Sequence, residues 1–162
     1  MLHQLISFTM HHSPALQQLG FTLIRIGFGT IILIFGYNKI ISGAENLTQL
    51  GSAMGLFGIT WGYLWWGYAA ALTELCGGMA FILGLYTRIA SIPLIWLLIV
   101  AIRFHLQNND PFMKWSFAAL CLCIAIGYFV AGGGVYSIDY FFNRQSSNKL
   151  SQPSTFSDTY NQ

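Results

Sequence analysis

The stretch WGYLWWGYAAALTELCGGMAFILGLY, residues 61–86, decides the fold, because it is apolar, long and uncharged except at Glu74. A helix of about 20 apolar residues crosses the hydrocarbon core of a bilayer. An ionised carboxylate at the centre of that core costs ~2.5–3.5 kcal/mol on insertion scales. Glu74 therefore needs a partner, a proton or water, and this makes it the strongest indication of function in the chain.

The composition of the whole chain is that of a membrane protein. Of its 162 residues 55% are hydrophobic and only 7% are charged, and the mean hydropathy is +0.58. This length leaves room for about four spans with short loops and no separate water-soluble domain. The expected fold is all-α, a polytopic membrane four-helix bundle. The net charge of +2 is scattered, without the basic stripe that nucleic acids require, so nucleic acid is excluded as a partner.

The apolar stretches and the turns between them predict how the chain is organised. The predicted spans are residues 19–37, 61–86, 89–104 and 115–131. The short turn at residues 84–88 makes the second and third spans an antiparallel hairpin. Apolar residues recur at roughly helical spacing in residues 43–60, which predicts a short helix lying on the bundle. Residues 19–140 form the predicted membrane domain, between a leader, residues 1–18, and a polar tail, residues 141–162, that is expected to be disordered.

Two stripes of small and charged residues are predicted to bring the first two spans together. Residues at spacings of three and four stack on one face of a helix, and glycines let membrane helices approach closely. The first stripe consists of Arg25, Gly29, Ile32, Gly36 and Lys39, and the second of Ala70, Glu74, Gly77, Gly78 and Phe81. Because burying either charge alone is costly, Arg25 and Glu74 are expected to form an ion pair between the spans.

Two interpretations of the Arg25–Glu74 pair remain open. In the first, the pair is structural and fixes the register of the two helices. In the second, Glu74 handles protons or hydrogen-bonds a polar head group, because ionisable residues inside membranes are functional by default. A quinone suits such a site, since it needs a hydrogen-bonding group at each carbonyl and an apolar approach for its tail. Its predicted contacts are Arg25, Glu74, Gly29, Gly77 and Gly78.

His105, at the end of the third span, is the third candidate catalytic residue beside Arg25 and Glu74. Imidazole titrates near neutral pH, so His105 could relay protons between water and a buried site. The alternative is an ordinary surface histidine. Because successive spans alternate in direction, His105 and Lys39 are expected on one face of the membrane, with Arg88 on the other.

The three cysteines, Cys76, Cys121 and Cys123, fall within apolar spans and are interpreted as small buried hydrophobes. A redox-active thiol pair is the alternative interpretation. The cysteine spacing fits no tetrahedral metal set, so no metal site is predicted. The sequence also contains no motif for binding flavin, nicotinamide or an iron–sulfur cluster.

Several short pieces of the sequence together point to a family. They are LIRIG at 23–27, GYNK at 36–39, ELCGG at 74–78, GLYTR at 84–88, His105, and GVYSID at 134–139. In this order and at these spacings they resemble the DoxX family over about residues 19–140. The chain departs from the usual Gly-Pro-Gly-Arg element of the family, having Gly-Gly-Gly-Val at residues 132–135, so a basic residue is missing there.

The resemblance implies a four-helix bundle in the bacterial plasma membrane. Some DoxX members are the small subunit of a quinone-reducing thiosulfate oxidoreductase or of a membrane redox complex tied to thiol stress. The chain is therefore expected to be a small accessory subunit of a quinone-linked redox complex, acting as an oxidoreductase only together with partner proteins. Its expected partners are the lipid bilayer and a protein partner or a second copy of the chain. The alternatives are a non-enzymatic scaffold or assembly factor, whose Arg25–Glu74 pair is structural, and a small proton-coupled transporter.

Overall fold

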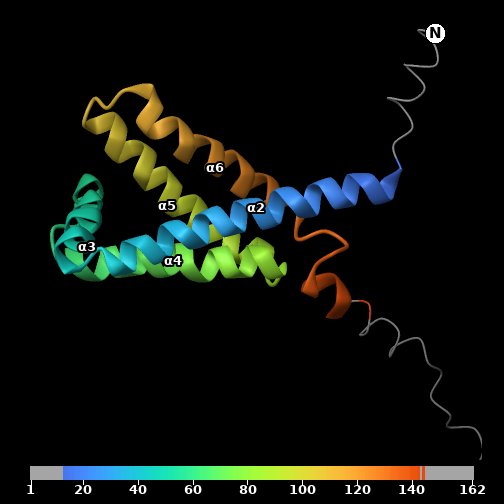
Figure 1. Ribbon diagram of the computed structural model, residues 1–162. Helices are drawn as coiled ribbons and strands as arrows, with labels where there is room; N and C mark the ends of the chain where they lie inside the picture. Colours follow the sequence, from blue (N-terminus) through green and yellow to red (C-terminus); the bar gives the residue numbers. More distant parts are fainter. Residues whose placement is uncertain (1–12, 143, 145–162) are drawn as a thin grey trace, which may run out of the picture.

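The computed structural model describes residues 13–142 and residue 144, and these residues form helices and loops without a strand among them. The helices are α2 (Pro14–Ile41), α3 (Ala44–Gly51), the 3₁₀ helix η1 (Ser52–Phe57), α4 (Tyr63–Leu83), α5 (Thr87–Gln107) and α6 (Phe112–Ala131), arranged as shown in Figure 1. A last helical turn begins at residue 138. The predicted tail falls almost entirely outside the described residues, as do the first 12 residues of the predicted leader.

In the described part of the chain, four helices are long and apolar enough to cross a membrane, namely α2, α4, α5 and α6. The predicted all-α membrane bundle is thereby confirmed. Helix α2 begins at Pro14, five residues before the start of the predicted span, because proline suits the first position of a helix. The Ser13 hydroxyl oxygen caps this helix by accepting a hydrogen bond from the Leu16 amide at 3.3 Å. Residues 43–60, predicted as one short helix, form α3 and then η1.

Helices α2 and α4 pack antiparallel along most of their length, and glycines set how close they come (Figure 1). A Cβ added to Gly29 would lie 2.8 Å from the carbonyl oxygen of Gly78, and one added to Gly36 would lie 2.5 Å from the amide nitrogen of Leu75. Side chains at these positions would clash with the neighbouring backbone. The two predicted stripes therefore do face each other.

The second pair of helices, α5 and α6, crosses the first pair and then diverges from it (Figure 1). Near the crossing lies the main core, made of Phe28, Ile32, Phe81, Leu94, Leu98, Cys121, Ala125 and Tyr128. Toward the diverging end, η1 fills part of the gap by packing Ala53 and Met54 against Val100 of α5. The bundle thus has two unlike ends, described below as the closed end and the open end.

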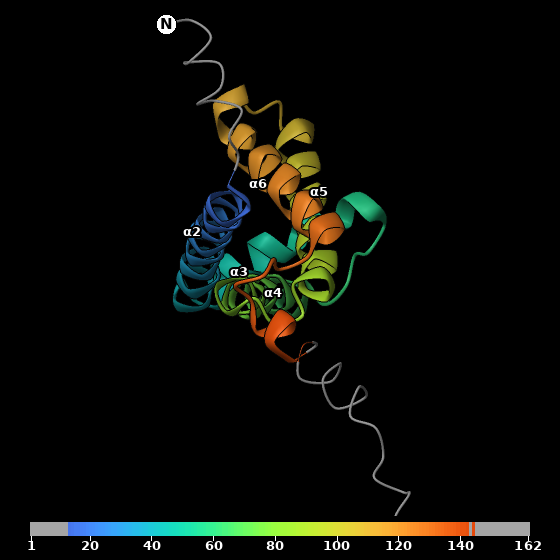
Figure 2. The same ribbon diagram turned by 90° about the vertical axis from the view of Figure 1, so that its right-hand side faces the viewer.

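The closed end comprises the α4–α5 turn, residues 84–86, and the segment that follows α6, residues 132–139. Figure 2 shows this segment running from the end of α6 across the end of the bundle to the last helical turn. There the Asp139 carboxylate accepts hydrogen bonds from the amides of Tyr86, at 2.8 Å, and Thr87, at 3.3 Å. It thereby caps the start of α5. Arg88 donates to the carbonyl oxygen of Val130 at 3.0 Å, which ties α5 to the end of α6.

The open end comprises the last turns of α2, the first half of α4 and the α5–α6 loop, residues 108–111. Lys39 and His105 both lie there and line one cavity, whereas Arg88 lies at the closed end. Lys39 and His105 therefore lie at one end of the bundle and Arg88 at the other, as the alternating direction of the spans predicts. Because the helices diverge here, a cavity forms between them.

Candidate functional site

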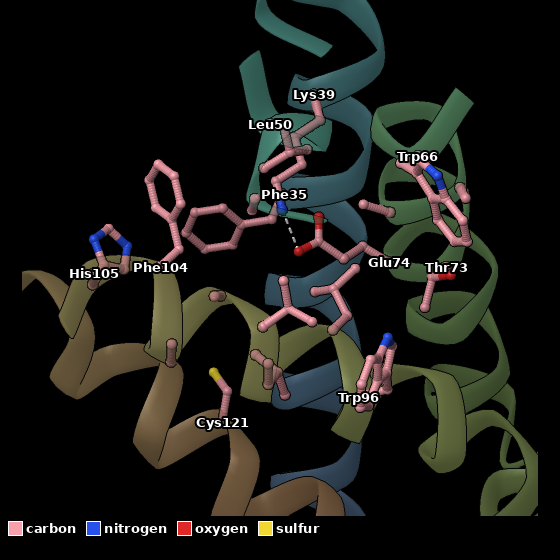
Figure 3. A pocket seen from close by; sticks show the side chains of 18 of the residues that line it. Phe35, Lys39, Leu50, Trp66, Thr73, Glu74, Trp96, Phe104, His105 and Cys121 are labelled. Atoms are coloured by element: carbon pink, nitrogen blue, oxygen red, sulfur yellow. Dashed lines mark hydrogen bonds and ion pairs between the residues drawn. The ribbon is translucent and has the colours of Figure 1, made fainter. Parts of the chain in front are cut away.

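Glu74 lies midway along α4 and is only 4% exposed. Its carboxylate oxygen Oε1 accepts a charged hydrogen bond from Nζ of Lys39, which projects from the last turn of α2 (Figure 3). The second oxygen, Oε2, is shielded from solvent and accepts no hydrogen bond from the described residues. An ionised carboxylate can accept several hydrogen bonds, so Glu74 has unused capacity.

Arg25 is also buried, with 2% exposure, but its partners lie at the closed end. The guanidinium donates to the carbonyl oxygen of Gly133 and, at 2.8 Å, to that of Tyr136. The predicted Arg25–Glu74 ion pair is therefore wrong. Gly36 packs against Glu74, and Arg25 lies about three turns earlier in α2, or roughly 16 Å along the helix axis at about 1.5 Å per residue.

A cavity of about 590 Å³ opens beside Glu74 between α2, α3, η1, α4, α5 and α6. Aromatic side chains from α2, α4 and α5 lie around the Lys39–Glu74 pair, among them Phe35, Trp66, Trp96 and Phe104 (Figure 3). The remaining walls are mostly aliphatic. The cavity is therefore a mainly apolar, ring-lined space with the Lys39–Glu74 pair in its wall and a few further polar side chains.

His105 and Lys114 line the same cavity, and both contact Asp110 of the α5–α6 loop. The His105 Nδ1 atom lies 2.8 Å from Asp110 Oδ2, and Lys114 Nζ donates to Asp110 Oδ1 at 2.8 Å. The hydrogen bond from His105, and after it the one from Lys114, lowers the pKa of Asp110 below its ordinary value. Because an ionised Asp110 can only accept, Nδ1 of His105 carries the proton in this contact.

The glycines predicted to contact a cofactor lie in helix contacts instead. Gly29 and Gly78 face each other between α2 and α4, and a Cβ on Gly77 would lie 2.8 Å from a methyl group of Leu94 in α5. None of these three glycines lines the cavity. Their position accounts for the close packing of the bundle.

The cysteines divide between the cavity and the outer surface. Cys121 is 3% exposed and lines the cavity, as a small buried hydrophobe would. Cys76 and Cys123 are exposed on the surface of the bundle. The prediction that all three are buried is therefore wrong for these two, which project from the outer faces of α4 and α6. Among the described residues, no group of three His, Cys, Asp or Glu side chains could hold a metal ion.

The main residue that sequence reasoning missed is Lys39. The sequence puts Lys39 on the same helical face as Arg25, but no role was predicted for it. It lies in the last turn of α2, the end of this helix nearer the start of α4. An explicit antiparallel alignment of the two glycine stripes would have favoured it. Asp110 had no comparable signal, because its importance depends on how the α5–α6 loop folds back on His105.

The sequence matches the DoxX family model over residues 20–107. The chain belongs to the DoxX family. With its candidate spans, this makes the DoxX chain a multi-pass membrane protein. The match runs from α2 to the end of α5 and so contains Lys39, Glu74 and His105, whereas Asp110 and the segment at residues 132–139 lie beyond it. No curated protein and no solved structure matched the chain.

Proposed function

We propose that this DoxX protein is a small accessory subunit of a quinone-linked redox complex in the bacterial plasma membrane. Its cavity at the open end holds the quinone head group, and Lys39 takes the place expected for Arg25 as the cation of the site. The observation that carries the proposal is Glu74, a carboxylate buried in the cavity wall with one oxygen that accepts no hydrogen bond from the described part of the chain. The electrons come from the redox centre of a partner subunit.

The burial of Glu74 supports the proposal that a ligand binds beside it, because one hydrogen bond from a lysine offsets only part of the free-energy cost of burying a carboxylate. Removing two charges from water costs several kcal/mol per ion, and the cost is recovered only when the remaining lone pairs find donors. Lys39 supplies a single hydrogen bond, to Oε1. A polar ligand group bound beside the pair would supply a second one.

The size and the walls of the cavity suit a flat ring with an apolar tail. Small-molecule sites are typically clefts of ~300–1,000 Å³ with apolar walls and few polar groups, and this cavity has about 590 Å³. The rings of Trp66, Trp96 and Phe104 offer flat contact surfaces (Figure 3). Lys39 and Glu74 lie together in the wall, and most of the other lining residues are apolar and can contact a hydrocarbon tail.

His105 supports the proposal by its place beside the α5–α6 loop. Reducing a quinone to a hydroquinone takes two electrons and two protons, so a buried quinone needs a route to water. His105 lines the cavity and is oriented by Asp110, a residue of the loop. In the proposed function His105 passes protons between water and the cavity.

The test is to purify the full-length protein from native membranes and to measure bound quinone and co-purifying subunits. Wild type should retain quinone, counted as the sum of its oxidised and reduced forms, and Glu74→Ala should weaken retention of the reduced form by ~1.5–3 kcal/mol, the worth of a hydrogen bond from a ring hydroxyl to a charged group. Glu45→Ala is the matched control, because Glu45 is an exposed carboxylate of α3 that does not line the cavity. Circular dichroism should show unchanged helix content in both variants.

One observation favours a second candidate, a non-enzymatic scaffold in which the Lys39–Glu74 pair is structural. The pair lies beside the close contact between Gly36 and α4, where an ion pair could fix the register of the two helices. Unaltered quinone retention in a folded Glu74→Ala protein, or no quinone in wild type, would favour this scaffold over the redox subunit.

A further inference from the structure

The Lys39–Glu74 pair restricts the chemistry of any group bound beside it. The ammonium of Lys39 can only donate hydrogen bonds, and the carboxylate of Glu74, ionised in its contact with Lys39, can only accept them. The ammonium has two further protons, and Oε2 of Glu74 accepts none. A group that contacts both residues must therefore accept from Lys39 and donate to Glu74.

A hydroxyl group meets both requirements and a carbonyl group meets one. A ring hydroxyl accepts from Lys39 through its oxygen and donates its proton to Glu74. A ring carbonyl in the same place accepts from Lys39 but turns its lone pairs toward the carboxylate, which leaves Oε2 unsatisfied. We propose that Lys39 and Glu74 together select a ring hydroxyl over a ring carbonyl, so that the cavity takes the reduced, hydroquinone form of its ligand.

The discrimination resides in Glu74, because Lys39 can donate to either form of the ring. Oε2 is shielded in the structure, so the carboxylate must rotate part-way about the last bond of the side chain for the ligand to reach it while Oε1 stays paired with Lys39. The aromatic walls, which include Trp66 and Trp96, contact the ring in both oxidation states and do not discriminate. A site built to hydrogen-bond a hydroxyl rejects analogues that lack it, since its own polar group is then left unpaired.

This inference rests on the proposed function and specifies which redox form the site retains. A hydrogen bond to a charged group corresponds to about a tenfold or greater difference in affinity. A tenfold preference for the hydroquinone raises the two-electron reduction potential of the bound ligand by about 30 mV. The bound ring is then a better electron acceptor than the same ring free in the lipid.

The test compares the affinities of a decyl-substituted benzoquinone and its hydroquinone for the full-length protein, by calorimetry under anaerobic conditions in detergent. Wild type should bind the hydroquinone at least about tenfold more tightly. Glu74→Gln places an amide, which both donates and accepts, beside the ring, so the two affinities should come within about twofold of each other. Glu45→Gln, altered at an exposed carboxylate outside the cavity, should keep the wild-type preference.

The possible outcomes separate this inference from the proposed function. Equal affinities in wild type, or tighter binding of the quinone, would overturn the hydroquinone preference and leave the quinone site standing. Binding of neither form would overturn both. The wild-type comparison needs no variant, so it decides the question even if Glu74→Gln fails to fold.

Discussion

At the closed end of the bundle a buried cation is held by backbone carbonyls, and at the open end a buried anion is held by one lysine. Arg25 donates to Gly133 and Tyr136 in a segment that also caps α5 through Asp139. Within residues 13–142, Glu74 accepts a side-chain hydrogen bond from Lys39 alone, and a cavity lies beside it. Both charged residues are buried to a similar degree, so burial alone does not distinguish them.

The difference teaches how a structural charge can be told from one that serves a ligand. Each hydrogen bond of Arg25 joins α2 to the segment after α6, so the contacts of this residue hold distant parts of the chain together. Glu74 joins α2 to α4, which are already locked by glycine contacts, and it lines the cavity, whereas Arg25 does not. Each of the two residues has one buried atom without a hydrogen bond from the described residues, Oε2 of Glu74 and Nε of Arg25, so the cavity makes the difference. We therefore expect changes at the closed end to lower stability and changes at the open end to alter binding.

The largest effect is expected from removing the cation of the closed end. Arg25→Ala leaves the carbonyl oxygens of Gly133 and Tyr136 without their donors, at ~1–3 kcal/mol each. The unfolding free energy should fall by roughly 2–6 kcal/mol, measured by denaturant titration in micelles followed by circular dichroism. Arg103→Ala, at an exposed arginine of α5, is the control and should change it by less than about 0.5 kcal/mol. Equal stability of the two variants would remove the distinction between the ends.

A smaller effect is expected where the glycine contacts connect the two ends. A Cβ on Gly78 would lie 2.6 Å from the Leu33 amide nitrogen and 2.7 Å from the Gly29 carbonyl oxygen, so α2 and α4 must move apart. Gly78→Ala should cost ~1–3 kcal/mol, as overpacking of a tight interface does. Gly27→Ala is the matched control on α2, because a Cβ there meets nothing within 4 Å, and it should be neutral or slightly stabilising. Destabilisation by the control alone would contradict the packing described.

The smallest effect is expected from pH at the rim of the open end. Hydrogen bonds from His105 and Lys114 lower the pKa of Asp110 in the folded protein. A carboxyl group with a lowered folded pKa stabilises the protein above its unfolded pKa of about 4, and this contribution is lost as the pH falls through the folded pKa. Melting temperatures of wild type and Asp110→Asn should therefore differ slightly at pH 6 and converge in acid. A difference that grows toward acid pH would have the wrong sign.

The fold was largely predictable because membrane spans are set by length and hydropathy. Helices α2, α4, α5 and α6 each correspond to a predicted apolar stretch, and residues 84–88 were recognised as a tight turn. The small helices after α2 were less predictable. The sequence of residues 43–60 shows a helical spacing, but it does not show the change from the α-helix α3 to the 3₁₀ helix η1.

The site was predictable only in part, because a helical face is visible in sequence but the register between two helices is not. Glu74 and Arg25 were both correctly expected to be buried. Arg25 and Lys39 lie on the same face of α2, so either could have reached Glu74 until the contact of Gly36 with α4 was known. The true partners of Arg25 are carbonyl oxygens of residues 133 and 136, and a backbone carbonyl leaves no signature in a sequence.

The most direct test of the account compares one variant from each end, Asp139→Asn and Glu74→Ala, for melting temperature and for hydroquinone affinity. Asp139→Asn weakens the cap of α5, at about 1 kcal/mol, so it should lower the melting temperature by ~2–4 °C and leave the affinity unchanged. Glu74→Ala should lose at least about tenfold in affinity and still fold with wild-type helix content. Wild-type affinity in a folded Glu74→Ala protein, or an equal loss of affinity in Asp139→Asn, would contradict the assignment of binding to the open end.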